Sequence, residues 1–486
     1  MSISNAMNNA YSGLSTMSRS AETVSNNVSN ALTEGYSHQQ VEYTATILGS
    51  QGSGVRIEGI TRSEDLLATR LRQGAAADFA NTSTKSDALA RLASVMGGPG
   101  EPDALAVQYA AFEDALSMAV SAPDSAALQQ GILLSAKSLT LTFNQISTEV
   151  NRVRIDADAS IAKDVETVNV SLKQIESLNA EIRMLSMSGR NVSTLEDQRQ
   201  IAVDRVNAII PIRQTKTDNG EIAIFSQGGE VLLNYSARTL EFTQTHLIVP
   251  SMTLASGALS GLSINGKPID VGTSGRGISG GSLSANFLVR DSVAPEFQTR
   301  LDALSVDLIE RFQDLSVDPT LAVGGAGLFA DAGGFYNSIN EIGISARISV
   351  NALVDPANGG EIWRLRDGIG ALTQGVVGES GQLIRMVSAL GDIKPASANL
   401  GLAIAMSGVG FAEEISSFWA SESARTDEEN AYKHSVHSLL RAEELHATGV
   451  DTDKEMQSLL VIEHAYAANA RVISVLDGLM KKLLEM

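Results

Sequence analysis

The sequence predicts a mostly helical α+β protein of elongated shape, with a small β-rich domain inserted into a body of long helices. Apolar residues recur with a heptad-like period at both ends of the chain and in one long central run, which is typical of helices packed side by side. Between the helical stretches lies a glycine-rich segment with two Asn-Gly turns, which indicates short antiparallel strands. We therefore expect a long-helix bundle as the body and the two terminal helices paired as a coiled coil at its base.

The N-terminal helix carries an apolar stripe whose steps alternate between four and three residues. Its members are Ile3, Met7, Ala10, Leu14, Met17, Ala21, Val24 and Val28. Such alternation is the seam of a coiled coil. Because alanines make this stripe thin, the helix would be marginal alone and needs a partner.

The C-terminal helix repeats the pattern, starting with a step of three. Its members are Leu459, Ile462, Tyr466, Asn469, Ile473, Leu476, Met480 and Leu483. Either helix, taken alone, could also be the core helix of one globular domain. Matching seams at both termini favour two assembly helices that pair outside the main body, and the polar Asn469 is placed to set their register.

A central run between Gly131 and Gly189 contains neither glycine nor proline. Its apolar positions from Leu139 to Leu185 recur about every 3.5 residues, again the period of a coiled coil. At 1.5 Å per residue, such a helix approaches roughly 80 Å and predicts an elongated domain. The last two helices are expected at Asp427–His446 and Lys454–Leu484.

Three domains follow from this pattern. Residues 1–60 with 427–486 form a terminal coiled-coil helical domain, and residues 61–211 with 287–426 form a helical body. Residues 212–286, with the turns in "QTKTDNGEIAIF" and "SINGKPI", form the β-rich outer domain.

Composition excludes several classes of function. The net charge of −20 and the lack of a basic run argue against nucleic acid and against an anionic membrane surface. The absence of cysteine excludes disulfides and thiolate chemistry. We find neither a signal peptide nor a run of about eighteen apolar residues that would cross a membrane.

No catalytic, cofactor-binding or metal site is expected. "GRGISG", Gly275–Gly280, matches a dinucleotide-binding spacing but lacks the surrounding βαβ pattern, and a flexible turn explains it. His434 and His437 could share a helix face, but no spacing fixes a third ligand, and solvated histidines explain them. "STLE", Ser193–Glu196, is expected to be a helix-capping box.

The segment "SNNVSNALTEGYSHQQ" resembles the signature of bacterial flagellar axial proteins, which comprise rod, hook and hook-associated subunits. The matching residues are Asn26, Asn27, Asn30, Thr33, Gly35 and Tyr36. The C-terminal "TGVDTDKEMQSLLVIEHAYAANARV" resembles the other shared end of these proteins. His38 departs from the basic residue common at its position.

Two central segments narrow the resemblance to the hook-associated protein 1 family. These are "LEDQRQIAVDRVNAIIPI", in which Gln200 replaces a frequent Asp, and "GGSLSANFLVRDSVAPEFQTRLDALSVDL". The long helix before the first segment speaks against the nearest alternative, a hook or distal rod subunit. An oxidoreductase that uses "GRGISG" and a surface adhesin are the alternatives from other classes.

The resemblance implies a structural role without a reaction, at the junction of the flagellar hook and filament. It implies as partners other copies of the chain, the hook protein, a second hook-associated protein and an export chaperone, but no nucleic acid or membrane. It also implies an extracellular location, reached through flagellar type III export without a cleavable signal peptide.

Overall fold

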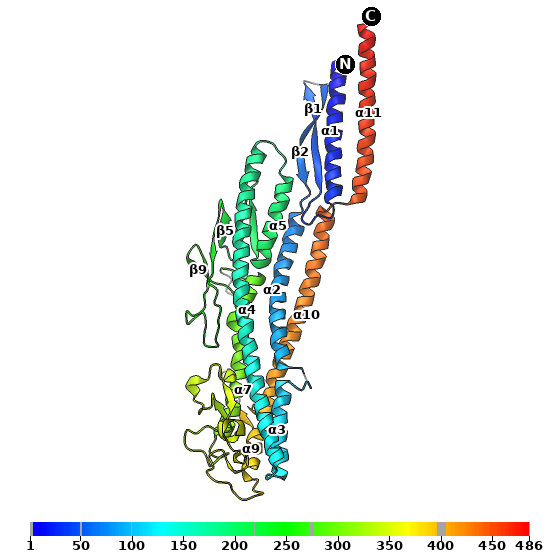
Figure 1. Cartoon of the computed structure of the whole chain (residues 1–486). Coiled ribbons are helices and arrows are strands. Elements are labelled where there is room, and N and C mark those ends of the chain that lie inside the picture. The colour runs from blue at the N-terminus through cyan, green and yellow to red at the C-terminus, as the bar shows by residue number, and fades with distance from the viewer. Residues whose placement is uncertain are drawn as a thin grey trace.

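The computed structural model describes residues 3–48, 51–98, 100–217, 219–272, 277–395 and 405–485. The molecule is long and narrow (Figure 1). Both termini lie at one end in a short rod, long helices form the middle, and a loop-rich region covers the other end. The expected α+β, mostly helical and elongated fold is confirmed.

The rod consists of two helices and one hairpin. Helix α1 (Ile3–Asn30) lies beside α11 (Thr452–Leu484), and strands β1 (Gln39–Leu48) and β2 (Gln51–Arg62) form an antiparallel hairpin on α1 (Figure 1). The hairpin is not among the elements predicted from the sequence. Its register shifts after Glu42 and again after Ala45, so the alternation of a regular strand is broken twice.

The body is built from long helices that run along the molecular axis (Figure 1). They are α2 (Leu66–Met96), α3 (Leu105–Ser121), α4 (Ala126–Met187), α5 (Ser193–Ile209), α7 (Ala294–Gln313) and α10 (Gly408–Thr448). α2 packs along α10, while α3 and α5 pack on α4. Helix α10 begins well before the expected Asp427, so the proposed domain boundary at 426/427 lies inside a continuous helix.

Helix α4 spans 62 residues, or about 93 Å at 1.5 Å per residue. The predicted apolar stripe is its buried face from Leu139 to Ile182. Stripe residues up to Ala157 belong to one hydrophobic core, and those from Ile161 to Ile175 belong to a second core. One helix therefore forms a wall of both cores and holds them in line.

The β-rich region lies on one side of α4 (Figure 1) and consists of two antiparallel sheets. The first contains β3 (Ile212–Lys216), β4 (Ile222–Ser226), β5 (Val231–Asn234) and β6 (Ser236–Ala237). The second contains β7 (Leu240–Glu241), β8 (Leu262–Ile264) and β9 (Lys267–Ile269). Asn265 and Gly266 join β8 to β9 with φ of 49° and 74°, the left-handed geometry that an Asn-Gly hairpin turn requires.

Short elements fill the remainder. Helix α6 (Gly281–Leu288) continues through a π-helical turn at Val289–Val293 into α7. Among the described residues, the loop-rich end contains α8 (Arg364–Asp367), α9 (Gly381–Gly391), β10 (Phe329–Asp331), β11 (Ile348–Val350), β12 (Lys394–Pro395), β13 (Ala405–Met406) and four 3₁₀ turns. Aromatic side chains anchor this end to the body: Phe112 contacts Phe312 and Phe329 with ring centroids 5.7 and 5.3 Å apart.

Leu172, which is fully buried in the second core, should be essential for that half of the body. We expect Leu172→Ala to lower the free energy of unfolding by about 2–5 kcal/mol, through lost transfer energy and a cavity. The matched control is Leu141→Ala, on the exposed face of the same helix, which should change it by less than about 0.5 kcal/mol. Urea unfolding followed by circular dichroism measures both, and equal effects would contradict the assignment of the buried face.

Candidate functional site

The terminal helices α1 and α11 lie against each other, and the residues of the predicted seam differ in how far they are buried. On α1, Ala10 and Val24 are buried and Val28 is exposed, while the half-buried members are Ile3, Met7, Leu14, Met17 and Ala21. On α11, the half-buried members are Leu459, Ile462, Asn469, Ile473 and Leu476, and the exposed members are Tyr466, Met480 and Leu483. The C-terminus lies beyond the N-terminus (Figure 1), so the last turns of α11 extend past α1.

Asn469 faces a notch in α1. A Cβ atom added to Gly13 would lie 3.0 Å from Asn469 Nδ2, so the glycine makes room for the amide. The amide nitrogen donates to the carbonyl oxygen of Ala465 in its own helix, at 3.1 Å. Because a polar side chain meets the one residue type without a side chain, this pair is suited to fix the relative position of the two helices.

The hairpin contacts another face of α1 through Ser12. The Ser12 hydroxyl accepts a hydrogen bond from the backbone nitrogen of Val55 at 3.2 Å and donates to the carbonyl oxygen of Asn9. Gly54 approaches so closely that a Cβ there would lie 2.2 Å from Ser12 Oγ. The N-terminal helix is thus enclosed between α11 and the hairpin.

A buried polar group holds the base of the rod together, and we call it the Asn27 cluster: Asn27, Tyr36, His38, Gln39 and Glu455. Asn27 Nδ2 donates to the carbonyl oxygen of Gln39 at 2.8 Å and to Glu455 Oε2 at 3.1 Å. Asn27 Oδ1 accepts from the backbone nitrogen of Gln39 and from the Tyr36 hydroxyl, at 3.1 and 2.9 Å. A single amide therefore connects α1, β1 and α11.

The remaining contacts of the cluster involve two ionisable side chains. Burial, together with the nearby carboxylates of Asp197 and Glu455, raises the pKa of Tyr36 to about 12, so its hydroxyl remains a donor at neutral pH. His38 Nε2 lies 3.0 Å from Glu455 Oε1, and its Nδ1 lies 3.2 Å from Ser63 Oγ. The buried Glu455 also lies in the first turn of α11, where the helix dipole favours a carboxylate.

Other signature residues shape the turn that leads from α1 to this cluster. Thr33 donates its backbone N–H to the carbonyl oxygen of Asn30, and Asn30 Nδ2 donates to that of Asn26. Gly35 has a φ of 78°, and a Cβ there would lie 2.6 Å from Ile201 in α5. His38, Gln39 and Glu455 were not predicted as partners; no local sequence pattern connects Glu455 to Asn27, from which it is 428 residues away.

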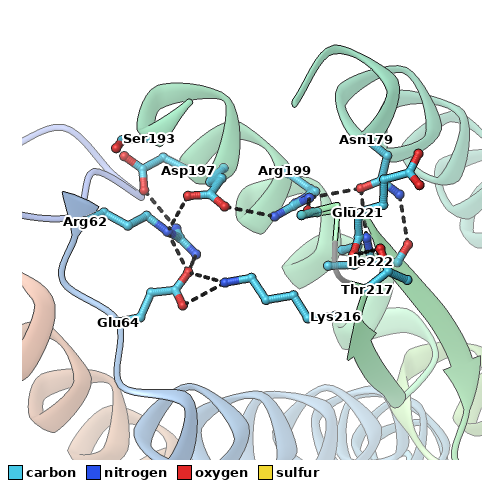
Figure 2. Close-up of polar contacts among 12 residues, drawn as sticks. Arg62, Glu64, Asn179, Ser193, Asp197, Arg199, Lys216, Thr217, Glu221 and Ile222 are labelled. Carbon is cyan, nitrogen blue, oxygen red and sulfur yellow. Dashed lines mark hydrogen bonds and ion pairs between the residues drawn. The ribbon is translucent and has the colours of Figure 1, made fainter. Parts of the chain in front are cut away.

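The end of the hairpin is fastened to the body by Arg62 (Figure 2). Arg62 NH1 donates to Asp197 Oδ1 at 3.0 Å, and its Nε donates to Glu64 Oε1 at 2.9 Å. Burial opposes the charge of Arg62, but Glu64, Glu196 and Asp197 raise its pKa overall. Asp197 Oδ2 also accepts from the backbone nitrogen of Ser37, at 3.4 Å, so α5 holds the turn and the hairpin together.

The "LEDQRQ" segment has a structural use in α5. Arg199 NH1 donates to Asn179 Oδ1 at 3.0 Å and to the carbonyl oxygen of Gly220 at 2.7 Å, which joins α4, α5 and the first sheet (Figure 2). The expected capping box at Ser193 is wrong. The cap position is Val192, and Ser193 Oγ instead donates to the carbonyl oxygen of Ile60, because the hairpin lies beside this helix end.

The residues considered for chemistry have packing roles. His434 and His437 lie against the ring of Phe79 with centroids 5.0 and 5.8 Å apart. The part of the chain that the structure describes contains no group of three residues that could hold a metal ion. In "GRGISG", Gly275 and Arg276 lie outside the described residues, while at Gly277 a Cβ would lie 2.2 Å from the carbonyl oxygen of Asp270.

The stretch Gly408–Leu484 contains the one helical segment of the described residues whose length and composition bear on a membrane span. It contains a window of eighteen residues with mean hydropathy 1.3, long and apolar enough to cross a membrane by length and composition alone. Only 6% of that window is buried. The apolar residues of α11 are interspersed with polar ones, so the expected absence of an unbroken apolar run still holds.

Two family models match the chain. The model described as "Flagellar hook-associated protein FlgK helical domain" matches residues 89–328, and "Flagellar basal body rod FlgEFG protein C-terminal" matches residues 443–486. A solved structure, "The structure of the flagellar hook junction protein FlgK from Burkholderia pseudomallei", shares 19% identity and a TM-score of 0.43, over 55% of this chain and 49% of that one.

Curated relatives carry the name "Flagellar hook-associated protein 1". The relative from Bacillus subtilis (strain 168) is 22% identical and covers 98% of this chain and 96% of its own length. The relative from Escherichia coli (strain K12) is 26% identical over 54% of this chain, and that from Salmonella typhimurium is 25% identical over 48%. The match spans 52% and 43% of those two proteins. The chain is therefore similar, over almost its whole length, to flagellar hook-associated protein 1, a structural protein of the bacterial flagellum.

Proposed function

We propose that this chain forms the junction between the flagellar hook and the filament, by polymerisation through its paired terminal helices. The single observation that carries the proposal is the second apolar stripe of α11. While one face of this helix packs on α1, the residues Val461, Ala468, Val472, Val475 and Leu479 form another heptad-spaced stripe that is exposed. A helix with two apolar faces can bind α1 of its own chain and a neighbouring copy at once.

Assembly of this kind follows from the geometry of unlike surfaces. We propose that the exposed stripe of α11 binds a different patch on the neighbouring copy, so that contacts between copies join unlike surfaces. Such heterologous contacts continue a helical array instead of closing a dimer. The seam residues of α1 and α11 and the division into a terminal, a body and an outer domain remain parts of this proposal.

The partners follow from the junction role. We propose other copies of this chain, the hook protein below it and a second hook-associated protein above it, together with an export chaperone before assembly. The chain is an extracellular component of the flagellar axis, and we propose that it arrives by flagellar export without a cleavable signal peptide. A hook or distal rod subunit is the alternative, since the C-terminal match bears a rod-protein description while residues 89–328 match a hook-associated one.

Electron microscopy of a strain that lacks this gene tests the junction role, with the medium assayed for shed filament protein. We expect complete hooks without filaments and filament protein in the medium, because filament subunits lose the surface on which they assemble. Re-expression of the wild-type chain is the control and should restore filaments. Missing or malformed hooks would instead indicate a rod or hook subunit, and normal filaments would refute the proposal.

Asn469→Leu tests the seam. We expect the fraction of hooks that carry filaments to fall several-fold, because leucine removes the polar group that meets the Gly13 notch and permits alternative registers. The matched control is His464→Leu on an exposed face of the same helix. Filament counts by electron microscopy measure both variants, and an unchanged count for Asn469→Leu would exclude a role in register.

Asn27→Ala tests the Asn27 cluster. The variant leaves the buried Glu455 carboxylate and the Gln39 backbone with unsatisfied groups, each of which costs about 1–3 kcal/mol. We expect amide hydrogen exchange to accelerate about tenfold or more in the hairpin and the first turns of α11, but not in α4. Asn26→Ala, at an exposed neighbouring position, is the control and should leave exchange unchanged. Equal exchange in both variants would show that the cluster does not hold the rod together.

A further inference from the structure

A cleft of about 720 Å³ opens where the end of β2 and the start of α2 meet α5, β3 and β4. Its wall contains one carboxylate, Glu64, and five cationic residues: Arg62, Arg70, Arg199, Arg213 and Lys216. The whole chain carries 36 basic and 56 acidic residues, so a cationic cleft is unusual for its composition. The overall composition of the chain therefore does not explain why these five cations gather in one cleft.

Three of the five cations are used within the molecule (Figure 2). Arg62 binds Asp197 and Glu64, and Lys216 Nζ lies 3.1 Å from Glu64 Oε2. Arg199 is buried and bonded to Asn179 and Gly220, and burial lowers its pKa. These three side chains hold the inner wall of the cleft in place.

Arg70 and Arg213 differ from them. Both side chains are exposed, and among the described residues no carboxylate forms an ion pair with either one. The same lining contains apolar groups, including Leu66, whose side chain is 60% exposed, Pro211 and Phe225. Two free guanidinium groups beside an apolar floor suit a short loop that carries two carboxylates and a small apolar residue.

The chain itself contains such a loop between α2 and α3. Glu101, Pro102 and Asp103 are consecutive and exposed, and in the described part of the chain neither carboxylate has an ion pair. Glu101 accepts a hydrogen bond from the backbone nitrogen of Gly98, which orders the loop. Figure 1 shows that this connection lies far along the body from the start of α2, which contains Arg70.

We propose that the cleft of one copy receives the loop Glu101–Asp103 of a neighbouring copy, with Arg70 and Arg213 facing the two carboxylates. Within one molecule the loop cannot reach the cleft, because the 27 residues of helix between them span about 40 Å. The contact joins unlike surfaces, as a growing helical array requires. For copies that lie parallel, it corresponds to an offset of about 40 Å along α2. The inference rests on the proposed polymerisation and adds a contact in the body to those of the terminal helices.

Disulfide trapping tests this contact directly, since the natural chain contains no cysteine. The variant Asp103→Cys/Arg213→Cys is expressed in the deletion strain, hook–basal bodies are purified and mildly oxidised, and the products are separated without reductant. We expect a ladder of dimers and larger multimers that collapses on reduction. Each single cysteine variant, and the pair Asp103→Cys/Arg152→Cys with an exposed arginine on α4, should give no ladder.

Reversing the charges of the cleft and of the loop tests the same contact in a second way. Arg70→Glu/Arg213→Glu and Glu101→Arg/Asp103→Arg should each lower the fraction of hooks with filaments several-fold, and the combined variant should restore it. Thermal unfolding of each purified monomer shows that it folds. Assembled junctions without a ladder, an unaffected arginine variant, or a failure of the combined variant to recover would each overturn the proposal. If the deletion strain itself keeps normal filaments, the junction role fails instead, independently of these variants.

Discussion

The continuous apolar face of α4 is the constraint on which the rest of the molecule depends. Residues from Ile132 to Ala157 contribute to one core, and residues from Ile161 to Ile175 contribute to the other. Where α4 passes from the first core to the second, Asp158 and Arg290 form a fully buried ion pair with 2.6 Å between Oδ1 and NH1. A buried pair contributes little net stability, but it penalises any shift that separates its members. It therefore fixes the position of the turn Val289–Val293, between α6 and α7, along α4.

The geometry of the terminal rod depends on other interactions than that of the body. Its seam is thin in apolar area, and polar contacts around Asn27 and Arg62 determine its geometry instead. The residues Asn27 and Tyr36 thus serve an internal connection between α1, β1 and α11. A rod that is aligned by polar contacts can leave its apolar surface for neighbouring copies.

Local sequence patterns predicted the elements that depend on residues near one another in the chain. The stripe from Leu139 to Ile182 predicted α4, and the Asn265–Gly266 pair predicted a hairpin turn. The β1–β2 hairpin escaped prediction because its bulges break the alternation of side chains. The Asn27 cluster escaped it because its partner Glu455 comes from the opposite end of the chain. The cap at Ser193 was mispredicted because Ile60, from another element, takes its hydroxyl.

The acidic net charge and the exposed apolar stripe of α11 act on association at different distances. A monomer with net charge −20 resists association at a distance, since like charges repel over about 8 Å at physiological ionic strength. The apolar stripe of α11 favours association only on contact, when its area leaves water. A chain with this combination remains separate until an existing array places several complementary surfaces around it at once. Growth from the end of a preformed structure is then favoured over association of free monomers, as a junction requires.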